Sequence, residues 1–515
     1  MTEPAAPAQA RPAPPGRRPG RDLTSGPIGK TLILFALPLL GSNVLQSLNG
    51  SANAIWVSHS LGEAALTATS NANQIFFLML GAAFGATMAA NILIGQAIGA
   101  GDPVAAKRVV GTATAFFILL SLVIGASGAL LTPAILTLMG TPADARENAI
   151  IYLRVIFSAM PFMYFFSFLM MAQRATGDSR TPFYFSLLSV GLDIVLNPLL
   201  IMGIGPFPRM GIAGSATSTL IAQTTTLAMI LIHLYRTNSI LVLRPSEWGL
   251  LKPDFIIVKA LVLKGMPMAL QMMVTSLAAV SMMSFVNRYG SHTAAAYGAA
   301  AQLWTYVQMP ALAMSGAVSS MAAQNVGANR MDRVERAALI GSAYAILLTA
   351  TPVLLIYAVE PYVLRLFLPG ASPSLPIAMH INSYALWGFI PFGIAFVLAG
   401  TARATGAVWP PLVAMALALW GVRIPFAVLL QSRLGADAVW MAFPLGGIAT
   451  CVFALAYYRW GGWRKARMMD TRPRGSLPDT GLSPPIGFEE TEAAEEAAEA
   501  LVSRDAPSSP NRPGS

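Results

Sequence analysis

Twelve long apolar stretches restrict this chain to one class of structure. A bilayer core about 30 Å thick needs about 20 apolar residues per helical span. Stretches of that length lie at 31–55, 71–97, 109–132, 150–172, 182–203, 211–235, 260–286, 293–320, 336–358, 378–402, 410–431 and 438–459. A transmembrane barrel would instead show segments of about ten residues with alternating hydrophobicity. The sequence therefore predicts an all-α membrane protein with twelve transmembrane helices.

Composition and charge agree with this class and indicate an orientation. Of the 515 residues 55% are hydrophobic and 11% are charged, against about 25% charged in soluble domains. If both termini are cytoplasmic, the outer loops hold only five of the 33 basic residues, which are Arg146, Arg209, Arg288, Arg365 and Arg433. This is the positive-inside pattern. It predicts a multi-pass protein of the inner (plasma) membrane, surrounded by the lipid bilayer, with no nucleic-acid partner despite a net charge of +10.

The chain also repeats itself at an offset of 228 or 229 residues. "GQAIGAGDPVAAKR" (95–108) matches "AQNVGANRMDRVER" (323–336), and "QRATGDSRTP" (173–182) matches "TARATGAVWPP" (401–411). Six spans per copy mean that both copies enter the membrane from the same side, as in many secondary transporters. We expect two pseudo-symmetric six-helix lobes between polar ends. The predicted parts are a disordered cytoplasmic N-terminal arm (1–26), an N-lobe (27–235), a cytoplasmic linker (236–259), a C-lobe (260–462) and a disordered cytoplasmic tail (463–515).

Pro38 and Pro267 occupy matching positions early in spans 1 and 7. Proline removes a backbone hydrogen bond and permits a bend. Neighbouring helices can compensate for that loss within a membrane. The pattern fits a static kink and a moving hinge equally well, and we take the two prolines as candidate hinges.

One aspartate, Asp193, lies near mid-depth in span 5, whereas the other acidic residues lie in loops, tails or span ends. An ionised carboxylate at that depth costs about 2.5–3.5 kcal/mol on insertion scales, and such residues usually face a bundle interior or a cavity. Asparagine would serve equally well for holding helices together. A carboxyl group that is neutral when dry and ionised when water or a cation arrives can exchange a proton for a cationic substrate. The position therefore predicts an ion-coupling site.

Polar residues follow one helical face on three spans of the first half. The spacings i, i+3 or i+4, i+7 and i+11 place each set in a narrow stripe. The stripes are Ser42, Gln46, Asn49 and Asn53 in span 1, Ser186, Ser189, Asp193 and Asn197 in span 5, and Ser215, Thr219, Gln223 and Thr226 in span 6. Hydrogen bonding between helices is the ordinary explanation for most such residues. Our candidates for ion coupling are Asp193, Asn197 and Asn53, and those for the substrate cavity are Gln46, Asn49, Ser189, Ser215, Thr219 and Gln223.

The second half carries Arg423 at mid-depth in place of a carboxylate. Arg423 could bind an anion, anchor to a carbonyl oxygen or extend to the interface. The single cysteine, Cys451, and the four histidines near span ends show no spacing typical of a metal site. Intramembrane enzymes need paired carboxylates, a Ser/His pair or metal ligands. We therefore expect no metal, no cofactor and no enzymatic activity.

Several motifs resemble those of the multidrug and toxic compound extrusion (MATE) family. They are "ALPLLGSNVLQSLN", "GQAIGAGDPVAAKR", "QRATGDSRTPFY", "LDIVLNPLLI" with "GPFPRMGIAGSATSTLIAQ", "GMPMALQ", "RATGAVWPPL" and "WGVRIP". The resemblance runs from about residue 28 to residue 465. It implies two six-helix lobes in a V shape. It also implies export of bulky, usually cationic, amphipathic compounds in exchange for protons or sodium ions.

The coupling residues depart from the pattern of the bacterial branch that this sequence resembles most, in which the coupling carboxylates lie in the N-terminal lobe. In that branch span 1 typically has an aspartate where this chain has Asn53. Span 5 typically reads Asn-x-x-x-Asp, and this chain reads Asp193-x-x-x-Asn197. Some relatives carry an acidic residue in span 7, where Thr275 is the nearest match. One helical turn is about 5.4 Å, so we expect a coupling site that has moved along the same face.

These features favour a monomeric secondary antiporter that exports a small amphipathic, cationic compound in exchange for protons, or else sodium ions, by alternating access. The alternative is a flippase for a lipid-linked sugar or another lipid-like substrate. An anionic diphosphate headgroup should require several Arg or Lys residues in the central cavity, and only Arg423 and Arg154 qualify. A passive channel would not explain the two-lobe repeat.

Overall fold

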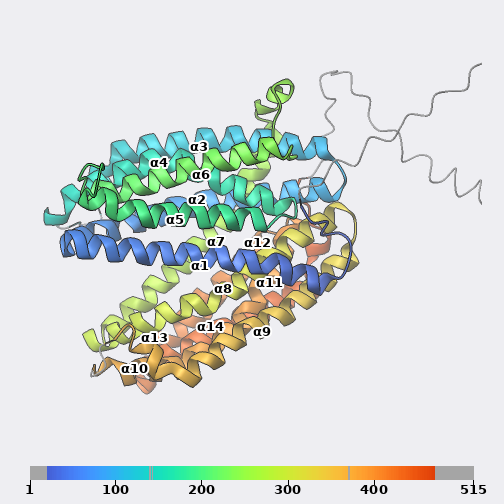
Figure 1. Cartoon of the computed structure of the whole chain (residues 1–515). Helices are drawn as coiled ribbons and strands as arrows, with labels where there is room; N and C mark the ends of the chain where they lie inside the picture. Colours follow the sequence, from blue (N-terminus) through green and yellow to red (C-terminus); the bar gives the residue numbers. More distant parts are fainter. Residues whose placement is uncertain (1–19, 139–140, 142, 369–371, 470–515) are drawn as a thin grey trace, which may run out of the picture. The chain divides into compact units, whose positions relative to one another are not determined.

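The computed structural model describes residues 20–138, 141, 143–368 and 372–469. Within these ranges all regular secondary structure is helical (Figure 1). The α-helices are α1 (Ile28–Leu61), α2 (Glu63–Gly99), α3 (Pro103–Leu138), α4 (Ala143–Ala175), α5 (Arg180–Met202), α6 (Ile212–Arg236), α7 (Phe255–Asn287), α8 (Ser291–Gly327), α9 (Met331–Leu364), α10 (Ser374–Ala385), α11 (Phe389–Thr405), α12 (Trp409–Ala416), α13 (Ile424–Leu434) and α14 (Asp437–Trp460). The short elements are η1 (Pro245–Leu251), η2 (Leu386–Gly388), η3 (Leu417–Arg423) and η4 (Gly462–Lys465).

All twelve predicted spans are helices in the structure. Span 10 combines α10, η2 and α11 (Ser374–Thr405), and span 11 combines α12, η3 and α13 (Trp409–Leu434). In the described part of the chain ten helices are long and apolar enough to cross a membrane. The other two spans are α2 and α8, each of 37 residues. Helices are expected here because lipid offers no partner for backbone N–H and C=O groups. The predicted fold class is confirmed.

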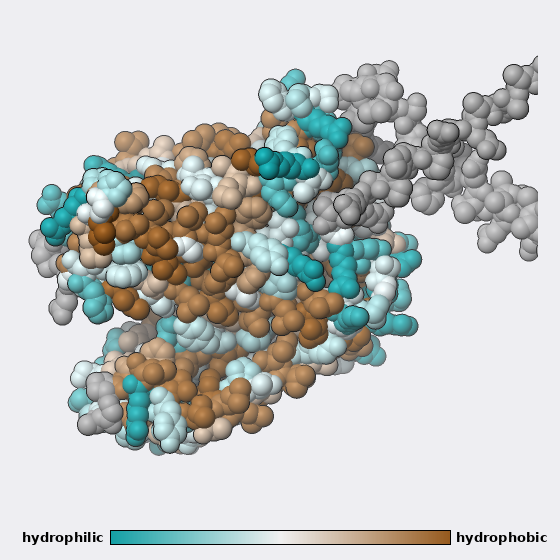
Figure 2. Space-filling view, in the orientation of Figure 1, coloured by the Kyte–Doolittle hydropathy of each residue, from teal (hydrophilic) through white to brown (hydrophobic). Residues whose placement is uncertain are grey.

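The surface agrees with a lipid environment. Figure 2 shows apolar residues over the middle of the helices and hydrophilic residues nearer their ends. Large side chains such as Leu119, Leu130, Leu347 and Leu354 are exposed along α3 and α9. Soluble monomers rarely expose contiguous apolar patches of this kind. The exposed residues therefore mark the faces that meet lipid tails.

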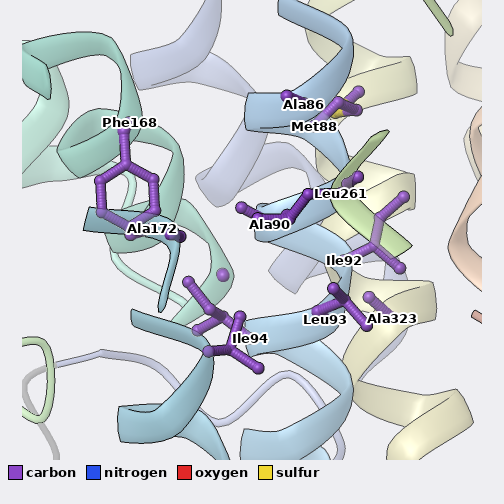
Figure 3. Close-up of a cluster of buried hydrophobic side chains, with 14 of the residues drawn as sticks. Ala86, Met88, Ala90, Ile92, Leu93, Ile94, Phe168, Ala172, Leu261 and Ala323 are labelled. Atoms are coloured by element: carbon purple, nitrogen blue, oxygen red, sulfur yellow. The ribbon is translucent and has the colours of Figure 1, made fainter. Parts of the chain in front are cut away.

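The largest buried cluster joins the two halves of the chain around α2. Figure 3 shows the last turns of α2 between Phe168 of α4, on one side, and Leu261 of α7 and Ala323 of α8, on the other. The contact between α2 and α7 is very close, because a Cβ atom on Gly85 would lie 2.1 Å from the carbonyl oxygen of Gly265. Small residues let membrane helices approach in this way. The core of the N-lobe is thus continuous with the first helices of the C-lobe.

Two glutamines paired by the sequence repeat link the halves where α2 and α8 end. The Gln96 side chain donates through Nε2 to the carbonyl oxygen of Ala404 at 2.7 Å. The Gln324 side chain donates through Nε2 to the carbonyl oxygen of Ala175, also at 2.7 Å. A Cβ on Gly99 would lie 1.8 Å from the Gln324 carbonyl oxygen, so the two helix ends touch. We call Gln96, Ala404, Gln324 and Ala175 the cross-lobe clasp.

Backbone conformation also repeats between the halves. Gly177 follows α4 and Gly406 follows α11, and the sequence repeat pairs them. Both have positive φ, 87° and 104° respectively. Glycine adopts this region without a steric penalty and is common just after a helix end. The repeat found in the sequence is therefore a repeat of structure as well.

The N-terminal arm differs from the expectation in its last residues. Leu23 is buried, its N–H donates to Oε1 of Gln324 at 3.2 Å, and its carbonyl oxygen accepts from Nδ2 of Asn325 at 3.0 Å. The N–H of Arg21 donates to the carbonyl oxygen of Gly177 at 3.1 Å. The expected disorder is therefore wrong for residues 20–26, which bridge the loop between α4 and α5 to the end of α8. Residues 1–19 lie outside the described residues.

The linker and the tail also differ from their predicted bounds. Helix α7 begins at Phe255, inside the predicted linker, because the Asp254 side chain accepts a hydrogen bond from the N–H of Ile256 at 2.9 Å and caps the helix. At the other end Trp463 is buried and stacks on Tyr458 with ring centroids 4.9 Å apart. The expected disorder is thus wrong for the first residues of the tail. Residues 470–515 lie outside the described residues.

Pro38 and Pro267 lie inside α1 and α7, and both helices continue through them. Among the described helices a residue with non-helical φ and ψ is recorded inside α9, at Val359 (φ −123°, ψ 16°). The role of the two prolines as hinges stays a prediction.

Candidate functional site

Asp193 lies in the middle of α5, where it is 4% exposed and faces α1 and α6. Its Oδ1 accepts a hydrogen bond from the Ser218 hydroxyl at 2.7 Å. Its Oδ2 accepts from Nδ2 of Asn49 at 2.9 Å. The Thr219 hydroxyl lies 3.3 Å from both carboxylate oxygens. The polar stripes of α1, α5 and α6 therefore meet at this carboxyl group, as lipid on the outside of the bundle would favour.

A second set of hydrogen bonds lies one turn along the same three helices. Oδ1 of Asn53 accepts from Nδ2 of Asn197 at 3.1 Å and from the Ser215 hydroxyl at 2.7 Å. Ser215 is linked to the first set, because the Ser218 hydroxyl also lies 2.8 Å from its carbonyl oxygen. Oδ1 of Asn197 is buried and has no hydrogen-bond partner among the described residues. Since buried polar atoms are normally paired, this acceptor is available to a proton donor or a cation.

Among the described residues, no cationic side chain pairs with Asp193. The ion pairs seen there, such as Lys107 with Glu247, Arg108 with Asp254, His380 with Asp437 and Arg464 with Glu335, involve other carboxylates. Hydroxyl and amide donors alone surround Asp193. An ionised carboxylate without a counter-charge is expensive in the membrane interior. Asp193 is therefore a candidate position for binding a proton or another cation.

Two members of this cluster were not singled out from the sequence. Ser218 is buried in α6 and makes one of the shortest contacts to Asp193. Tyr152 of α4 is 2% exposed, and its hydroxyl lies beside Asn53 and Ser215. Ser218 follows Ser215 by three residues, so helical spacing alone would have found it. Tyr152 lies near the start of its span and shows no polar stripe, so only tertiary structure reveals it.

The structure brings together some of the predicted residues and leaves others apart. Asp193, Asn197, Asn53, Asn49, Ser215 and Thr219 form the hydrogen-bonded cluster described above. In the described part of the chain Gln46, Ser189 and Gln223 have no hydrogen bond to it. Gln46 is exposed, Ser189 is buried one turn before Asp193, and Oε1 of Gln223 is buried without a partner. Their assignment to a substrate cavity stays a prediction.

The described residues of the C-lobe contain no copy of this cluster. The repeat offset of 229 pairs Asn49 with Ala278 and Asn53 with Met282, and both of these side chains are buried among apolar residues. The residues that the repeat pairs with Asp193, at offsets of 228 and 229, are Gly421 and Val422. The two lobes thus share a backbone repeat but differ in these side chains. The candidate ion site is confined to the N-lobe.

Two bundles of six membrane-spanning helices, related by a repeat and with a carboxyl group buried in the middle of a helix of the first bundle, define a class of helical membrane transporter. Comparison with known proteins gives the family. The MatE family model matches residues 38–199 and 267–429, once in each lobe. The chain belongs to the MatE family, whose members are membrane transporters and not enzymes in the usual sense.

Individual relatives and solved structures agree with this assignment. The chain is 36% identical to "Probable multidrug resistance protein YoeA" of Bacillus subtilis (strain 168), over 86% of this chain and 95% of that protein. It is 32% identical to "Probable multidrug resistance protein YpnP" of the same strain, over 87% of this chain and 98% of that protein. The structure described as "Crystal structure of MATE in the straight conformation" superposes with a TM-score of 0.79, at 23% identity, and covers 86% of this chain and 97% of that one. That likeness shows the fold.

Proposed function

We propose that this protein is a secondary active antiporter that exports amphipathic, cationic compounds in exchange for protons by alternating access. Family membership and the names of the relatives, two of them described as probable multidrug resistance proteins, support the export of such compounds. The proposed coupling role rests on Asp193. Its carboxylate is buried, accepts hydrogen bonds from α1 and α6, and has no counter-charge among the described residues. A proton and a cationic substrate compete for such a carboxylate, and that competition is what an antiporter requires.

Protons suit the Asp193 cluster better than sodium ions. Both carboxylate oxygens already accept hydrogen bonds, from Ser218 and Asn49. The Thr219 hydroxyl, 3.3 Å from each oxygen, can also accept, so it offers a partner to a protonated carboxyl group. Hard cations such as Mg²⁺ and Ca²⁺ are held by six or more oxygen ligands. The groups around Asp193 present hydrogens to it, which leaves few free oxygens for a sodium ion.

Alternating access is supported by where the lobes meet. The cross-lobe clasp lies at the ends of α2 and α8, which the positive-inside pattern places on the cytoplasmic side. On α1 the contacts with the C-lobe involve the first turns, where Leu39 approaches Gly316. Asn49 and Asn53 lie further along α1 and contact their own lobe. This arrangement corresponds to a state closed to the cytoplasm, from which opening of the clasp would give the opposite state.

A flippase for a lipid-linked sugar is the second candidate, and the described residues favour it less. A diphosphate headgroup calls for several convergent cations. Arg154 lies exposed on α4, and the Arg423 side chain lies within the C-lobe against Phe443. Arg174 is partly buried near the end of α4. Arg403 is buried near the end of α11, where it donates to Oε1 of Gln271 at 2.9 Å. These cations do not form one cluster.

Efflux from proteoliposomes tests the proposal. The protein is reconstituted, a cationic dye is loaded, and transport is followed under an imposed pH gradient and, separately, a sodium gradient. We expect Asp193→Asn to abolish pH-driven efflux while the variant still folds, because asparagine keeps the shape but cannot carry the proton. Asp437→Asn is the matched control, since Asp437 is an exposed carboxylate paired with His380. Efflux driven equally by wild type and Asp193→Asn would contradict the coupling role.

A further inference from the structure

A cavity lies where the start of α1, the loop between α4 and α5, and the segment 20–26 meet. Its volume is about 380 Å³. The residues that line it include Arg21, Leu34, Phe35, Asp178, Ser179 and Arg180. The positive-inside pattern places these helix ends on the cytoplasmic side. The cavity is separate from the Asp193 cluster, which lies in the middle of α5.

Close contact between two stretches of backbone forms one side of the cavity. The N–H of Arg21 donates to the carbonyl oxygen of Gly177 at 3.1 Å. A Cβ atom on Gly20 would lie 2.0 Å from the carbonyl oxygen of Thr176, and one on Gly177 would lie 2.0 Å from that of Arg21. Glycine permits such an approach because it has no Cβ. The contact holds the backbone of Arg21 beside the start of α5.

Ser179 stands at the N-terminal cap of α5 but does not cap the helix. The Asp178 side chain takes that role, because its Oδ1 accepts from the N–H groups of Arg180 and Thr181, both at 3.0 Å. Ser179 is 5% exposed, and its hydroxyl has no hydrogen-bond partner among the described residues. Buried polar groups are normally paired. A free hydroxyl beside a cavity therefore indicates that a ligand supplies the partner.

Two guanidinium groups make the cavity positive. Arg21 and Arg180 are both exposed, and neither takes part in an ion pair among the described residues. Asp178 contributes one negative charge, and its Oδ1 already accepts two hydrogen bonds. A phosphate group has oxygens for both arginines and for the Ser179 hydroxyl. The cavity therefore matches a ligand with one negative charge and several acceptor oxygens.

The cavity also has an apolar wall that leads to the lipid-facing surface. Leu34 and Phe35 of α1 form this wall. α1 and α5 lie side by side (Figure 1). About one turn beyond the cavity, Leu37 of α1 is 54% exposed and Tyr184 of α5 is 63% exposed. A phosphate group in the cavity can therefore remain attached to acyl chains in the bilayer, whereas a soluble anion would leave the apolar wall unused.

We propose that this cavity binds the phosphate group of an anionic phospholipid from the cytoplasmic leaflet. Arg21, Ser179 and Arg180 supply the donors, and the acyl chains extend past Leu37 and Tyr184. Anionic lipids of this leaflet attract basic residues at the membrane surface. A bound lipid would hold the segment 20–26 against α5. The inference does not depend on the proposed export function.

Binding of a fluorescent lipid to the full-length protein tests the inference. Phosphatidylglycerol that carries a fluorophore on one acyl chain is titrated with protein in neutral detergent, and fluorescence anisotropy gives the affinity. We expect Arg21→Gln and Arg180→Gln each to weaken binding about fivefold, which corresponds to about 1 kcal/mol per basic residue at a membrane surface. Ser179→Ala should also weaken binding about fivefold, because it removes a hydrogen bond to a charged group without removing a charge.

Arg236→Gln is the matched control for the arginine variants. Arg236 is the last residue of α6 and is exposed at the same end of the N-lobe, outside the cavity. This variant should bind the lipid as the wild type does. Short-chain phosphatidylglycerol should displace the fluorescent lipid, whereas inorganic phosphate at matched ionic strength should not. Size-exclusion profiles show whether each variant is folded.

Four outcomes overturn the inference. The first is the absence of saturable binding by the wild type. Equal weakening in Arg236→Gln, or no effect of Ser179→Ala, would assign the attraction to general surface charge. Displacement by inorganic phosphate would assign the cavity to a soluble anion. Binding that appears only after deletion of residues 2–19 would mean that the chain's own arm occupies the cavity.

Discussion

At the scale of single residues, one carboxyl group stands at the centre of the proposed coupling site. Asp193 and Asn197 lie four residues apart on one face of α5, and each is bonded to an asparagine of α1, Asn49 and Asn53 respectively. The two pairs form successive layers of one polar cluster. A carboxyl group in either layer would therefore meet similar partners. This arrangement explains how the carboxylate can stand one turn away from its place in the sequences that this chain resembles.

The exchange of the two residues gives the first prediction at this scale. The double variant Asp193→Asn/Asn197→Asp should recover part of the pH-driven efflux that Asp193→Asn alone loses, because Asn53 and Ser215 take over as partners of the carboxylate. Dye efflux in proteoliposomes measures this. Asn197→Asp alone is the control, since two neighbouring carboxylates repel each other and should impair folding or transport. No recovery in the double variant would mean that the layer containing Asp193 is specifically required.

At the scale of elements, the linker is held to the N-lobe by ion pairs outside the membrane. Glu247 of η1 contacts Lys107 of α3, and Arg108 of α3 contacts the helix cap Asp254 at 2.9 Å. Burial by itself would raise the pKa of Glu247, but hydrogen bonds from Lys107 and from the Arg244 backbone, together with their positive charges, lower that pKa overall. The pairs fix the path by which the chain enters α7. They therefore hold the start of α7, the first helix of the second lobe, against α3 of the first lobe.

The lowered pKa of Glu247 has a consequence for stability that can be measured. The folded-state pKa lies below the unfolded value of about 4.3, so the contribution is fully present above that pH and is lost as the pH falls through the folded-state pKa. Glu247→Gln should lower the unfolding free energy at pH 7 by roughly 0.2–1 kcal/mol, the range for partly exposed pairs. Thermal unfolding in detergent should show a larger difference from wild type at pH 7 than at pH 3.5.

At the scale of the whole molecule, two related hydrogen bonds and a bridging segment hold the lobes together at one end. Gln96 and Gln324 each bind a carbonyl oxygen of the opposite lobe. Gln324 also accepts from the N–H of Leu23, so the segment 20–26 reinforces one side of the clasp. Each hydrogen bond contributes about 0.5–1.5 kcal/mol. Contacts this weak can break during a transport cycle.

Removal of both glutamines should shift the protein toward the state that is open at the clasp. In a Cys451→Ser background, Ala323→Cys places a thiol in the buried contact between α2 and α8. We expect Gln96→Ala/Gln324→Ala to speed maleimide labelling of that thiol about tenfold, since two lost hydrogen bonds correspond to roughly 1–3 kcal/mol. Gln431→Ala removes a hydrogen bond to Tyr289 within one lobe and serves as the control. Equal labelling rates in all three proteins would exclude the clasp as a gate.

The fold could be predicted largely from the sequence, because lipid constrains the composition of each membrane-spanning segment. Each span needs a long apolar stretch, and the repeated motifs around Gly177 and Gly406 reveal the two lobes. Asp193 stood out for the same reason, because a carboxylate within an apolar stretch can be recognised in the sequence without knowledge of its tertiary contacts. The ends of the spans were less certain, as α7 shows: the Asp254 cap begins the helix five residues before the apolar stretch.

The partners of each side chain could not be predicted, because a polar stripe gives the face of a helix and not its neighbours. Gln46 shares the stripe of Asn49 and Asn53 but is exposed, while Tyr152 has no stripe and reaches the cluster from α4. The clasp and the burial of Leu23 likewise depend on residues about 150 to 300 positions apart. By itself the sequence determined the class of protein, its two lobes and its one mid-depth carboxylate, because local hydrophobicity shows which segments lie in lipid. Only the tertiary structure decided which donors surround that carboxylate and where the lobes are joined, since helix rotation and packing arise from contacts distant in the chain.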